Sequence, residues 1–410
     1  MKRIYLDYAS LTPIDPRVTR EMRKYSSGAY ANPSSLYKEG VAAKNALAIG
    51  RQKVADYLNA HLDEIIFTAG GTEANALAIE GVVKAFKGQK DNWNKKPHII
   101  ISAIEHSSIL ETANMMEKYG CEVTRLAVDK GGVISLNELK KAIKSETILV
   151  SIMTVNNEIG SVQPIKEIAK IIRHARADFR GPTSERSDLY PLLHTDAAQA
   201  LYEEINMDNF GVDLLTLDGG KVYGPRGIGA LYVRRLVIEG GLIEPIILGG
   251  GQERGLRSGT ENIPGIMGFG MALELLKSAH FSQLKWSEKE MTRLGELRNS
   301  FIEGLRKIRQ DITVNGSDQN DLSRQSPHIL NVSIPGIDNE FLLFQLDAKG
   351  IACSTKSSCL RDEEESYVLK AIIADSKTSL RFSFGRWTKK ADIKQALKVI
   401  AGIIGSPLAS

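Results

Sequence analysis

Cysteine is scarce in this 410-residue chain, which contains only Cys121, Cys353 and Cys359. Three thiols make neither a disulfide framework nor a plausible metal site, and they fit a reducing compartment. Long hydrophobic runs are also absent, so no segment of the sequence is suited to cross a bilayer. Residues 1–7 lack the apolar stretch that a secretory signal needs. We therefore expect a cytoplasmic protein with no membrane partner.

An excess of charge of one sign is absent as well. The chain has 53 lysines and arginines against 49 aspartates and glutamates, a net charge of +4. The basic residues are scattered, apart from short clusters at 84–96 and 234–235, which are typical of a solvated surface. We therefore expect no nucleic-acid partner. The length and the hydrophobic content of 42% suit a globular protein of two or more domains.

What the chain contains instead, from residue 64 onward, is an alternation of short apolar strands and longer helices. We expect strands at 65–68, 98–102, 122–126, 148–153, 192–196 and 212–217. We expect helices between most of them, at 72–87, 107–119, 135–144 and 165–177. This alternation predicts a mostly parallel sheet covered by helices on both faces. Residues 227–233 follow the last strand too closely for a crossover helix, so they are expected to form an antiparallel neighbour.

The remaining patterns suggest how the chain is divided. Further helices are expected at 17–25, 36–59, 265–277, 281–309 and 390–404. The segment Asn32–Ser35 offers an N-cap to the second of these helices. Polar segments at 89–96 and 179–189 look like surface insertions. We expect a large domain at residues 16–279 and a smaller α/β domain at 280–410, with residues 1–15 packing on the smaller one.

Two residues lie at or just past the ends of expected strands, where open α/β sheets bind ligands. Lys221 sits among small and turn-forming residues, and a primary amine there can form a Schiff base with an aldehyde cofactor. A solvated loop lysine is the alternative. Asp196 would need a cationic partner if buried, and the ring nitrogen of pyridoxal phosphate would provide one. The alternative role for Asp196 is to cap a helix that begins at Ala197.

Other polar residues fall at similar positions. The turn at Gly71 and Thr72 opens a helix whose N–H groups could bind phosphate, although it could also be an ordinary turn with Thr72 as its cap. His106 could stack on an aromatic cofactor or move protons, or it could simply begin a helix. Asn157 could bond a cofactor oxygen or a substrate carboxylate. Arg381 lies in an alternating strand pattern, where an inward arginine needs an anionic partner such as a carboxylate.

The three cysteines differ in their surroundings. Cys359 lies in the polar, charged stretch 354–365, where a thiol has no packing role. Cys353 follows apolar residues, and Cys121 opens a strand, so both are expected in the core. Cys359 is therefore the candidate nucleophile.

Taken together, these segments resemble the cysteine desulfurases that supply sulfur for iron–sulfur clusters, within the class V aminotransferase family. The resemblance covers nearly the whole chain. The segments that carry it are Tyr5–Tyr8, Gly70–Glu73, Glu105–His106, Val155–Gly160, Asp196–Gln199, Lys221–Pro225, Glu253–Thr260, the Cys359 loop, Ser366–Leu369 and Arg381–Ser383.

The resemblance implies the fold type I of pyridoxal 5′-phosphate enzymes, with that group as the cofactor. By resemblance, Lys221 holds the cofactor covalently and later moves protons, and His106 stacks on the ring. Asp196 would pair with the ring nitrogen, and Gln199 would contact the ring oxygen. The expected phosphate contacts are Gly71, Thr72, Asp218 and Thr260. Thr260 would reach the cofactor of a partner subunit, which implies a homodimer.

The resemblance also implies a substrate and a reaction. Asn157 and Arg381 would hold the carboxylate of L-cysteine. The Cys359 thiolate would attack the substrate sulfur, leaving L-alanine and a persulfide that passes to an acceptor such as an iron–sulfur scaffold protein. A selenocysteine lyase or another enzyme of this family is the alternative, although a transaminase has no need of Cys359. A non-catalytic scaffold for sulfur transfer is a further alternative, which the retained Lys221 and Asp196 argue against.

The sequence departs from the family pattern at two places. Gly220 stands where the family usually has histidine before the lysine, so a phosphate or substrate contact is missing or comes from elsewhere. The family's glycine-serine-small-cysteine run is here replaced by Lys356–Cys359, and four acids follow at 362–365. Those acids oppose formation of the Cys359 thiolate, whereas the basic residues on either side of the cysteine favour it.

Overall fold

The computed structural model describes residues 3–27, 30–89, 92, 94–179, 189–281, 286–317, 324–355 and 365–405. Strands and helices alternate along the chain as the sequence predicts, and the α/β class is confirmed. The strands are β1 (Ile4–Tyr5), β2 (Ile65–Thr68), β3 (His98–Ser102), β4 (Glu122–Leu126), β5 (Thr147–Ser151), β6 (Leu192–Asp196), β7 (Leu214–Asp218), β8 (Gly229–Val233), β9 (Thr313–Asn315), β10 (Ile329–Ser333), β11 (Ile351–Ala352) and β12 (Ser379–Ser383).

The helices have lengths between about one and six turns. They are α1 (Pro16–Ser27), α2 (Lys38–Leu58), α3 (Gly71–Gly88), α4 (Ser107–Lys118), α5 (Leu136–Ala142), α6 (Ile165–Phe179), α7 (Met207–Phe210), α8 (Arg235–Glu239), α9 (Ile263–Phe281), α10 (Trp286–Ile308), α11 (Asn339–Ala348), α12 (Tyr367–Ala371) and α13 (Lys390–Ile404). In the described ranges, none of these helices combines the length and apolarity that crossing a membrane requires.

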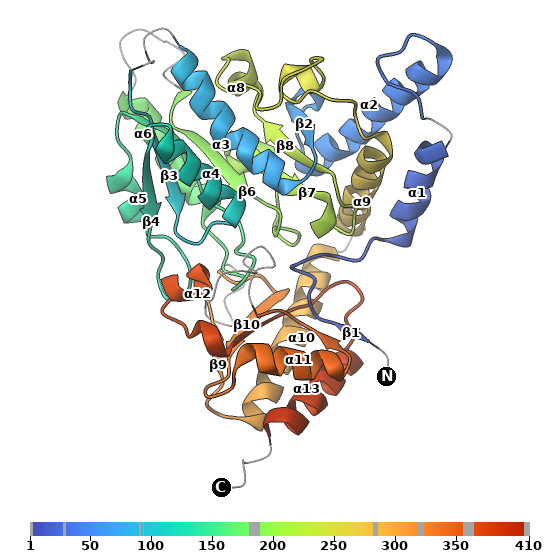
Figure 1. The fold of residues 1–410 in the computed structure, drawn as a ribbon, viewed down its shortest axis with the longest axis vertical. Helices are drawn as coiled ribbons and strands as arrows, with labels where there is room; N and C mark the ends of the chain where they lie inside the picture. Colours follow the sequence, from blue (N-terminus) through green and yellow to red (C-terminus); the bar gives the residue numbers. More distant parts are fainter. Residues whose placement is uncertain are drawn as a thin grey trace.

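The largest sheet of the described chain has seven strands in the order β2-β8-β7-β6-β5-β3-β4. Neighbouring strands from β7 to β4 are parallel, while β8 is antiparallel to both β2 and β7. Because β8 follows β7 after a short connection, it cannot return to run parallel, which confirms the antiparallel neighbour expected at 227–233. The carboxyl ends of β5, β6 and β7 therefore meet at one edge of this sheet (Figure 1).

Both faces of this sheet are buried, which explains why its central strands are apolar throughout. Successive strand side chains point to opposite faces. Ile99 and Ile101 of β3 pack in one hydrophobic cluster with residues of α3 and α4, whereas Ile100 packs in another cluster with residues of α6, α2 and α9. Figure 1 shows α3 and α4 lying across the sheet in the upper part of the molecule. The two helical layers hold the strand ends in fixed positions.

A second, antiparallel sheet has the order β12-β10-β9, and α10, α11 and α13 lie in the same lower part of Figure 1. The first strand also lies there: β1 pairs in parallel with β11, joining Ile4 to Ile351. An isolated bridge then joins Asp7 to Ser383 at the end of β12. The segment that follows runs back to the large sheet, because Thr12 donates its backbone N–H to the carbonyl of Gly220 over 3.0 Å.

Some boundaries differ from those expected. The strand expected at 148–153 is β5 (Thr147–Ser151), and the strand expected at 212–217 is β7, which continues to Asp218. The N-cap expected at Asn32–Ser35 is wrong, because α2 begins at Lys38 and its N-cap Tyr37 makes no side-chain capping bond. The Asn32 side chain instead accepts a hydrogen bond from the backbone of Ser34, 2.9 Å away, in a local turn.

Candidate active site

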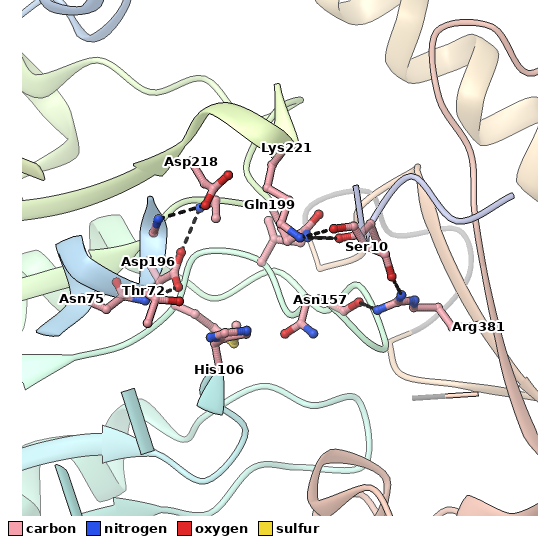
Figure 2. Close-up of a pocket in the computed structure, with 15 residues that line it drawn as sticks. Ser10, Thr72, Asn75, His106, Asn157, Asp196, Gln199, Asp218, Lys221 and Arg381 are labelled. Atoms are coloured by element: carbon pink, nitrogen blue, oxygen red, sulfur yellow. Dashed lines mark hydrogen bonds between the residues drawn. The ribbon is translucent and has the colours of Figure 1, made fainter. Parts of the chain in front are cut away.

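A cavity at the carboxyl ends of the parallel strands brings together most of the residues singled out from the sequence (Figure 2). It has a volume of about 190 Å³. Its lining includes Gly71, Thr72, His106, Asn157, Asp196, Gln199, Asp218, Lys221 and Arg381. Two expected residues are not part of it. Thr260 is exposed and does not line the cavity of its own chain, and Cys359 lies outside the described residues.

Lys221 ends the short 3-10 helix Gly219–Lys221 that follows β7. Its ammonium group donates hydrogen bonds to the backbone carbonyls of Ala9 and Ser10, over 3.1 and 2.5 Å. Figure 2 shows this side chain reaching into the cavity toward Ser10. Both carbonyls belong to the segment after β1. The amine is therefore held in place by residues that are distant from it in the sequence. The expectation of a lysine held at the rim of the sheet is met by this geometry.

Asp196 lies at the end of β6 and is buried. It does not cap a helix at Ala197, because no helix begins there. Its carboxylate accepts hydrogen bonds from the side-chain amide of Asn75, over 2.7 Å, and from the backbone of Ala198, over 2.9 Å. These two donors fix the carboxylate so that it faces the cavity, where it could hold a cationic ring nitrogen.

Asn75, one turn into α3, is a site residue that the sequence reasoning missed. It is 1% exposed and also donates to the hydroxyl of Ser108, over 2.9 Å. Its side-chain oxygen has no hydrogen-bond partner among the described residues. The signal in the sequence was a lone asparagine on the apolar face of α3, where a polar side chain needs a partner.

His106 is the N-cap of α4, and its ring Nδ1 accepts a hydrogen bond from the backbone of Ser108 over 3.2 Å. A neutral ring that accepts at Nδ1 carries its proton on Nε2. The preceding residue, Glu105, is fully buried, and this burial raises the pKa of its carboxyl to about 8. Glu105 accepts from the hydroxyl of Ser102 over 2.5 Å and from the backbone of Met153 over 3.0 Å. These bonds anchor the histidine between β3 and β5.

Arg381, on β12, enters the cavity from the smaller sheet and is 1% exposed. Its guanidinium forms an ion pair with Asp7 over 2.8 Å and donates to the Ser10 hydroxyl over 2.8 Å. It also donates to the backbone carbonyl of Asn157 over 2.8 Å, so Asn157 contacts the arginine through its backbone. The Nε of Arg381 has no hydrogen-bond partner among the described residues. An anionic ligand could therefore still gain a donor here.

The loop that carries Asn157 is shaped by its neighbours. The side-chain oxygen of Asn156 accepts hydrogen bonds from the backbones of Glu158 and Ile159, each over 2.9 Å, which closes a tight turn. The Glu158 carboxylate accepts from the hydroxyl of Ser366 over 2.6 Å. This bond links the loop to the residue that caps α12, so the loop that lines the cavity is tied to that helix.

The other cysteines are placed as expected. Cys121 and Cys353 are both buried. Burial raises the pKa of both thiols, and for Cys353 the rise is large. A thiolate is therefore disfavoured at both positions, and neither resembles a nucleophile. Arg386 forms an ion pair with Asp15 over 2.7 Å, and its guanidinium lies over the Tyr223 ring.

Curated cysteine desulfurases are similar to this chain over nearly its whole length. Among curated proteins, the cysteine desulfurase IscS of Dictyoglomus turgidum is 40% identical over 410 residues, covering 98% of this chain and 95% of that protein. The mitochondrial cysteine desulfurase of Candida albicans is 42% identical, covering 97% of this chain and 76% of that protein.

Solved structures with the same fold are also similar in sequence. A NifS-like protein matches with a TM-score of 0.84 and 30% identity, covering 98% of this chain and 99% of that one. The structure described as SspA in complex with cysteine matches with a TM-score of 0.73 and 34% identity, covering 93% and 98%. The fold expected from the resemblance is confirmed. The sequence profile described as Aminotransferase class-V matches residues 4–396, and the chain belongs to that family.

Proposed function

We propose that this chain is a cysteine desulfurase that uses pyridoxal 5′-phosphate to convert L-cysteine to L-alanine. The sulfur leaves as a persulfide on Cys359 and supplies iron–sulfur clusters or tRNA thiolation. The observation that carries the proposal is the convergence of Lys221, Asp196 and Arg381 on one cavity. These residues provide an amine, a fixed carboxylate and a buried cation, which suit an aldehyde cofactor and a carboxylate substrate.

The residues present fit the cofactor at its ring and aldehyde end. Asp196 would hold the ring nitrogen, Gln199 would face the ring oxygen, and His106 would stack on the ring. Asn75 belongs to the same wall, and its side-chain oxygen, which has no partner in the described part of the chain, can accept a hydrogen bond. When bound, the cofactor supplies an electron sink that stabilises the substrate after its Cα proton is lost.

The substrate carboxylate is expected at Arg381. Its guanidinium is already paired with Asp7, so L-cysteine would share or replace this partner. A buried arginine binds a carboxylate strongly because two parallel hydrogen bonds form in a site with little water. Holding this end of the substrate would place its Cα hydrogen within reach of the Lys221 amine, which would accept that proton.

Sulfur transfer requires a second thiol. The Cys359 thiolate would attack the substrate sulfur, a sulfur–sulfur bond would form and the bond from sulfur to Cβ would break. The electron pair of that bond would remain on the substrate carbon framework, which becomes alanine after protonation. Cys353 is the less suitable nucleophile because burial raises the pKa of its thiol and removes it from the cavity wall.

Incubation of the purified protein with L-cysteine tests the proposal. We expect equal amounts of alanine and acceptor-bound or reduced sulfur, and the visible absorbance of a lysine-bound aldehyde. Lys221→Ala should lose both. Conversion of selenocysteine alone would favour the alternative lyase, and a protein that forms no alanine and takes up no cofactor would contradict the proposal.

A further inference from the structure

The phosphate end of the cavity contains a carboxylate of the chain itself. Asp218, at the end of β7, accepts hydrogen bonds from two backbone N–H groups. The N–H of Gly71 lies 2.9 Å from its Oδ2, and the N–H of Gly220 lies 2.8 Å from its Oδ1. Gly71 begins α3, so its N–H carries the positive end of that helix. Donors of this kind are the ones that a bound phosphate would use.

Gly220, the residue before Lys221, lies close to the Asp218 carboxylate. A Cβ at Gly220 would lie 3.2 Å from Asp218 Oδ1 and 2.9 Å from Leu11 Cδ1. A Cβ at Gly71 would lie 3.3 Å from Asp218 Oδ2. A side chain as large as the histidine usual in the family therefore cannot occupy position 220 unless Leu11 and Asp218 move.

Two basic residues near this end of the cavity are directed to other partners among the described residues. Lys221 directs its ammonium group to the carbonyls of Ala9 and Ser10, and Figure 2 shows it pointing toward Ser10 and away from Thr72. Arg257 is paired with Glu73, with 2.8 Å between Nε and Oε1. A phosphate carries close to two negative charges near neutral pH. Placed beside Asp218, it would meet an anion where it needs donors, and the two groups would compete for the same N–H groups.

We propose that Asp218 sets how much the phosphate group contributes to cofactor affinity, by occupying the donors of Gly71 and Gly220. This inference rests on the proposed function. The chain then discriminates weakly between pyridoxal 5′-phosphate and pyridoxal, which lacks the phosphate. Replacing Asp218 by asparagine removes the negative charge and leaves only one accepting oxygen, which frees at least one donor and strengthens that discrimination.

The test compares the two aldehydes on the full chain, stripped of any bound cofactor. Dissociation constants are measured from the visible absorbance of the lysine-bound aldehyde, without any turnover. In Asp218→Asn we expect the ratio of the constants for pyridoxal and pyridoxal 5′-phosphate to rise at least tenfold over wild type. The constant for pyridoxal itself should change less than threefold. An unchanged or smaller ratio would overturn the inference.

Asp63→Asn is the matched control, because it removes one carboxylate that pairs with Arg235 over 2.9 Å and does not line the cavity. It should leave the ratio at the wild-type value. Asp218→Ser provides a second variant if the asparagine variant folds poorly. In addition, inorganic phosphate should raise the melting temperature of the Asp218 variants more than that of wild type, and equal shifts would also overturn the inference.

The outcomes separate the two hypotheses. If neither aldehyde binds to wild type or to any variant, the proposed function fails and this inference fails with it. If both aldehydes bind but the ratio is the same in wild type and Asp218→Asn, the function stands and only the role of Asp218 is rejected.

Discussion

At the scale of single residues, the surroundings of each cysteine determine whether its thiol can serve as a nucleophile. Burial raises the pKa of the Cys353 thiol, with the Asp7 carboxylate contributing in the same direction. Cys121, directly before β4, is buried too. The proposed reaction needs a thiol that reaches the substrate sulfur and then an acceptor. We therefore assign that role to Cys359, in the charged stretch of the sequence, rather than to either buried thiol.

We expect Cys359→Ser to keep cofactor binding but to lose persulfide and alanine production, by a factor of about 100 or more. The reason is that a hydroxyl is a poor nucleophile toward sulfur at neutral pH. Cys353→Ser is the matched control. It should keep turnover and lose about 1–2 kcal/mol of stability, because a buried hydroxyl replaces a buried thiol. Alanine release and mass spectrometry of the trapped persulfide read out both variants. A persulfide found on Cys353 would contradict the assignment of Cys359 as the nucleophile.

At the scale of one element, α10 offers a matched pair of glycines. A Cβ at Gly295 meets nothing within 4 Å, whereas a Cβ at Gly304 would lie 2.2 Å from Leu397 Cδ1 of α13. Gly295→Ala should raise the free energy of unfolding by about 0.5–1 kcal/mol through helix propensity. Gly304→Ala gains the same propensity but must displace Leu397, so it should be at least about 1 kcal/mol less stable than Gly295→Ala. Urea unfolding measures both, and equal stabilities would show that Leu397 moves aside freely.

The elements also show what the sequence could and could not predict. Apolar runs at 65–68, 98–102 and 192–196 became strands with the expected bounds, because both of their faces are buried. The polar residues at their carboxyl ends converge because parallel strands end at the same edge. Asn75 escaped prediction because its role depends on the position of Asp196, in a different element. Ser10 escaped for the same reason, since its contacts to Lys221 and Arg381 arise only from tertiary packing.

Across the whole molecule, buried histidines make stability depend on pH. Burial lowers the pKa of His98 to about 4, and those of His194 and His328 to about 3, from an ordinary value of 6.5. Below pH 6.5 these histidines therefore bind protons in the unfolded chain but not in the folded chain. Stability is lost as the pH falls from about 6.5 toward these values, by up to about 1.4 kcal/mol per pH unit for each histidine.

Replacing one of these histidines tests whether its burial lowers the stability at acidic pH. His194 lies in the core, with its ring between the hydroxyls of Ser151 and Thr216. In His194→Gln the loss of stability between pH 6.5 and pH 5 should be smaller than in wild type by up to about 2 kcal/mol, even if the variant is less stable throughout. His174→Gln, on the exposed side of α6, should keep the wild-type slope. Identical slopes for His194→Gln and wild type would refute this account.

At the scale of the whole molecule, we also propose that two copies of this chain form a homodimer. Thr260 does not reach the cavity of its own chain, and Leu248, in the loop that leads to it, is 82% exposed. An exposed apolar side chain beside such a loop suits contact with a second copy. We expect sedimentation velocity to show a homodimer, and Leu248→Asp to weaken it at least tenfold. Phe344→Asp, at a side chain 69% exposed on α11, should not. A fully active wild-type monomer at assay concentration would exclude the shared site.

The first strand has a consequence for how the protein is made. Ile4 pairs with Ile351, and Asp7 bonds to Arg381, which lies 374 positions further along the chain. On the ribosome, Ile4 and Asp7 therefore cannot pair until the chain has been made as far as these distant partners. Until then, the carbonyls of Ala9 and Ser10 have no fixed position from which to hold Lys221. A nascent chain can assemble the large sheet early, but its active site closes only after β12 has left the exit tunnel.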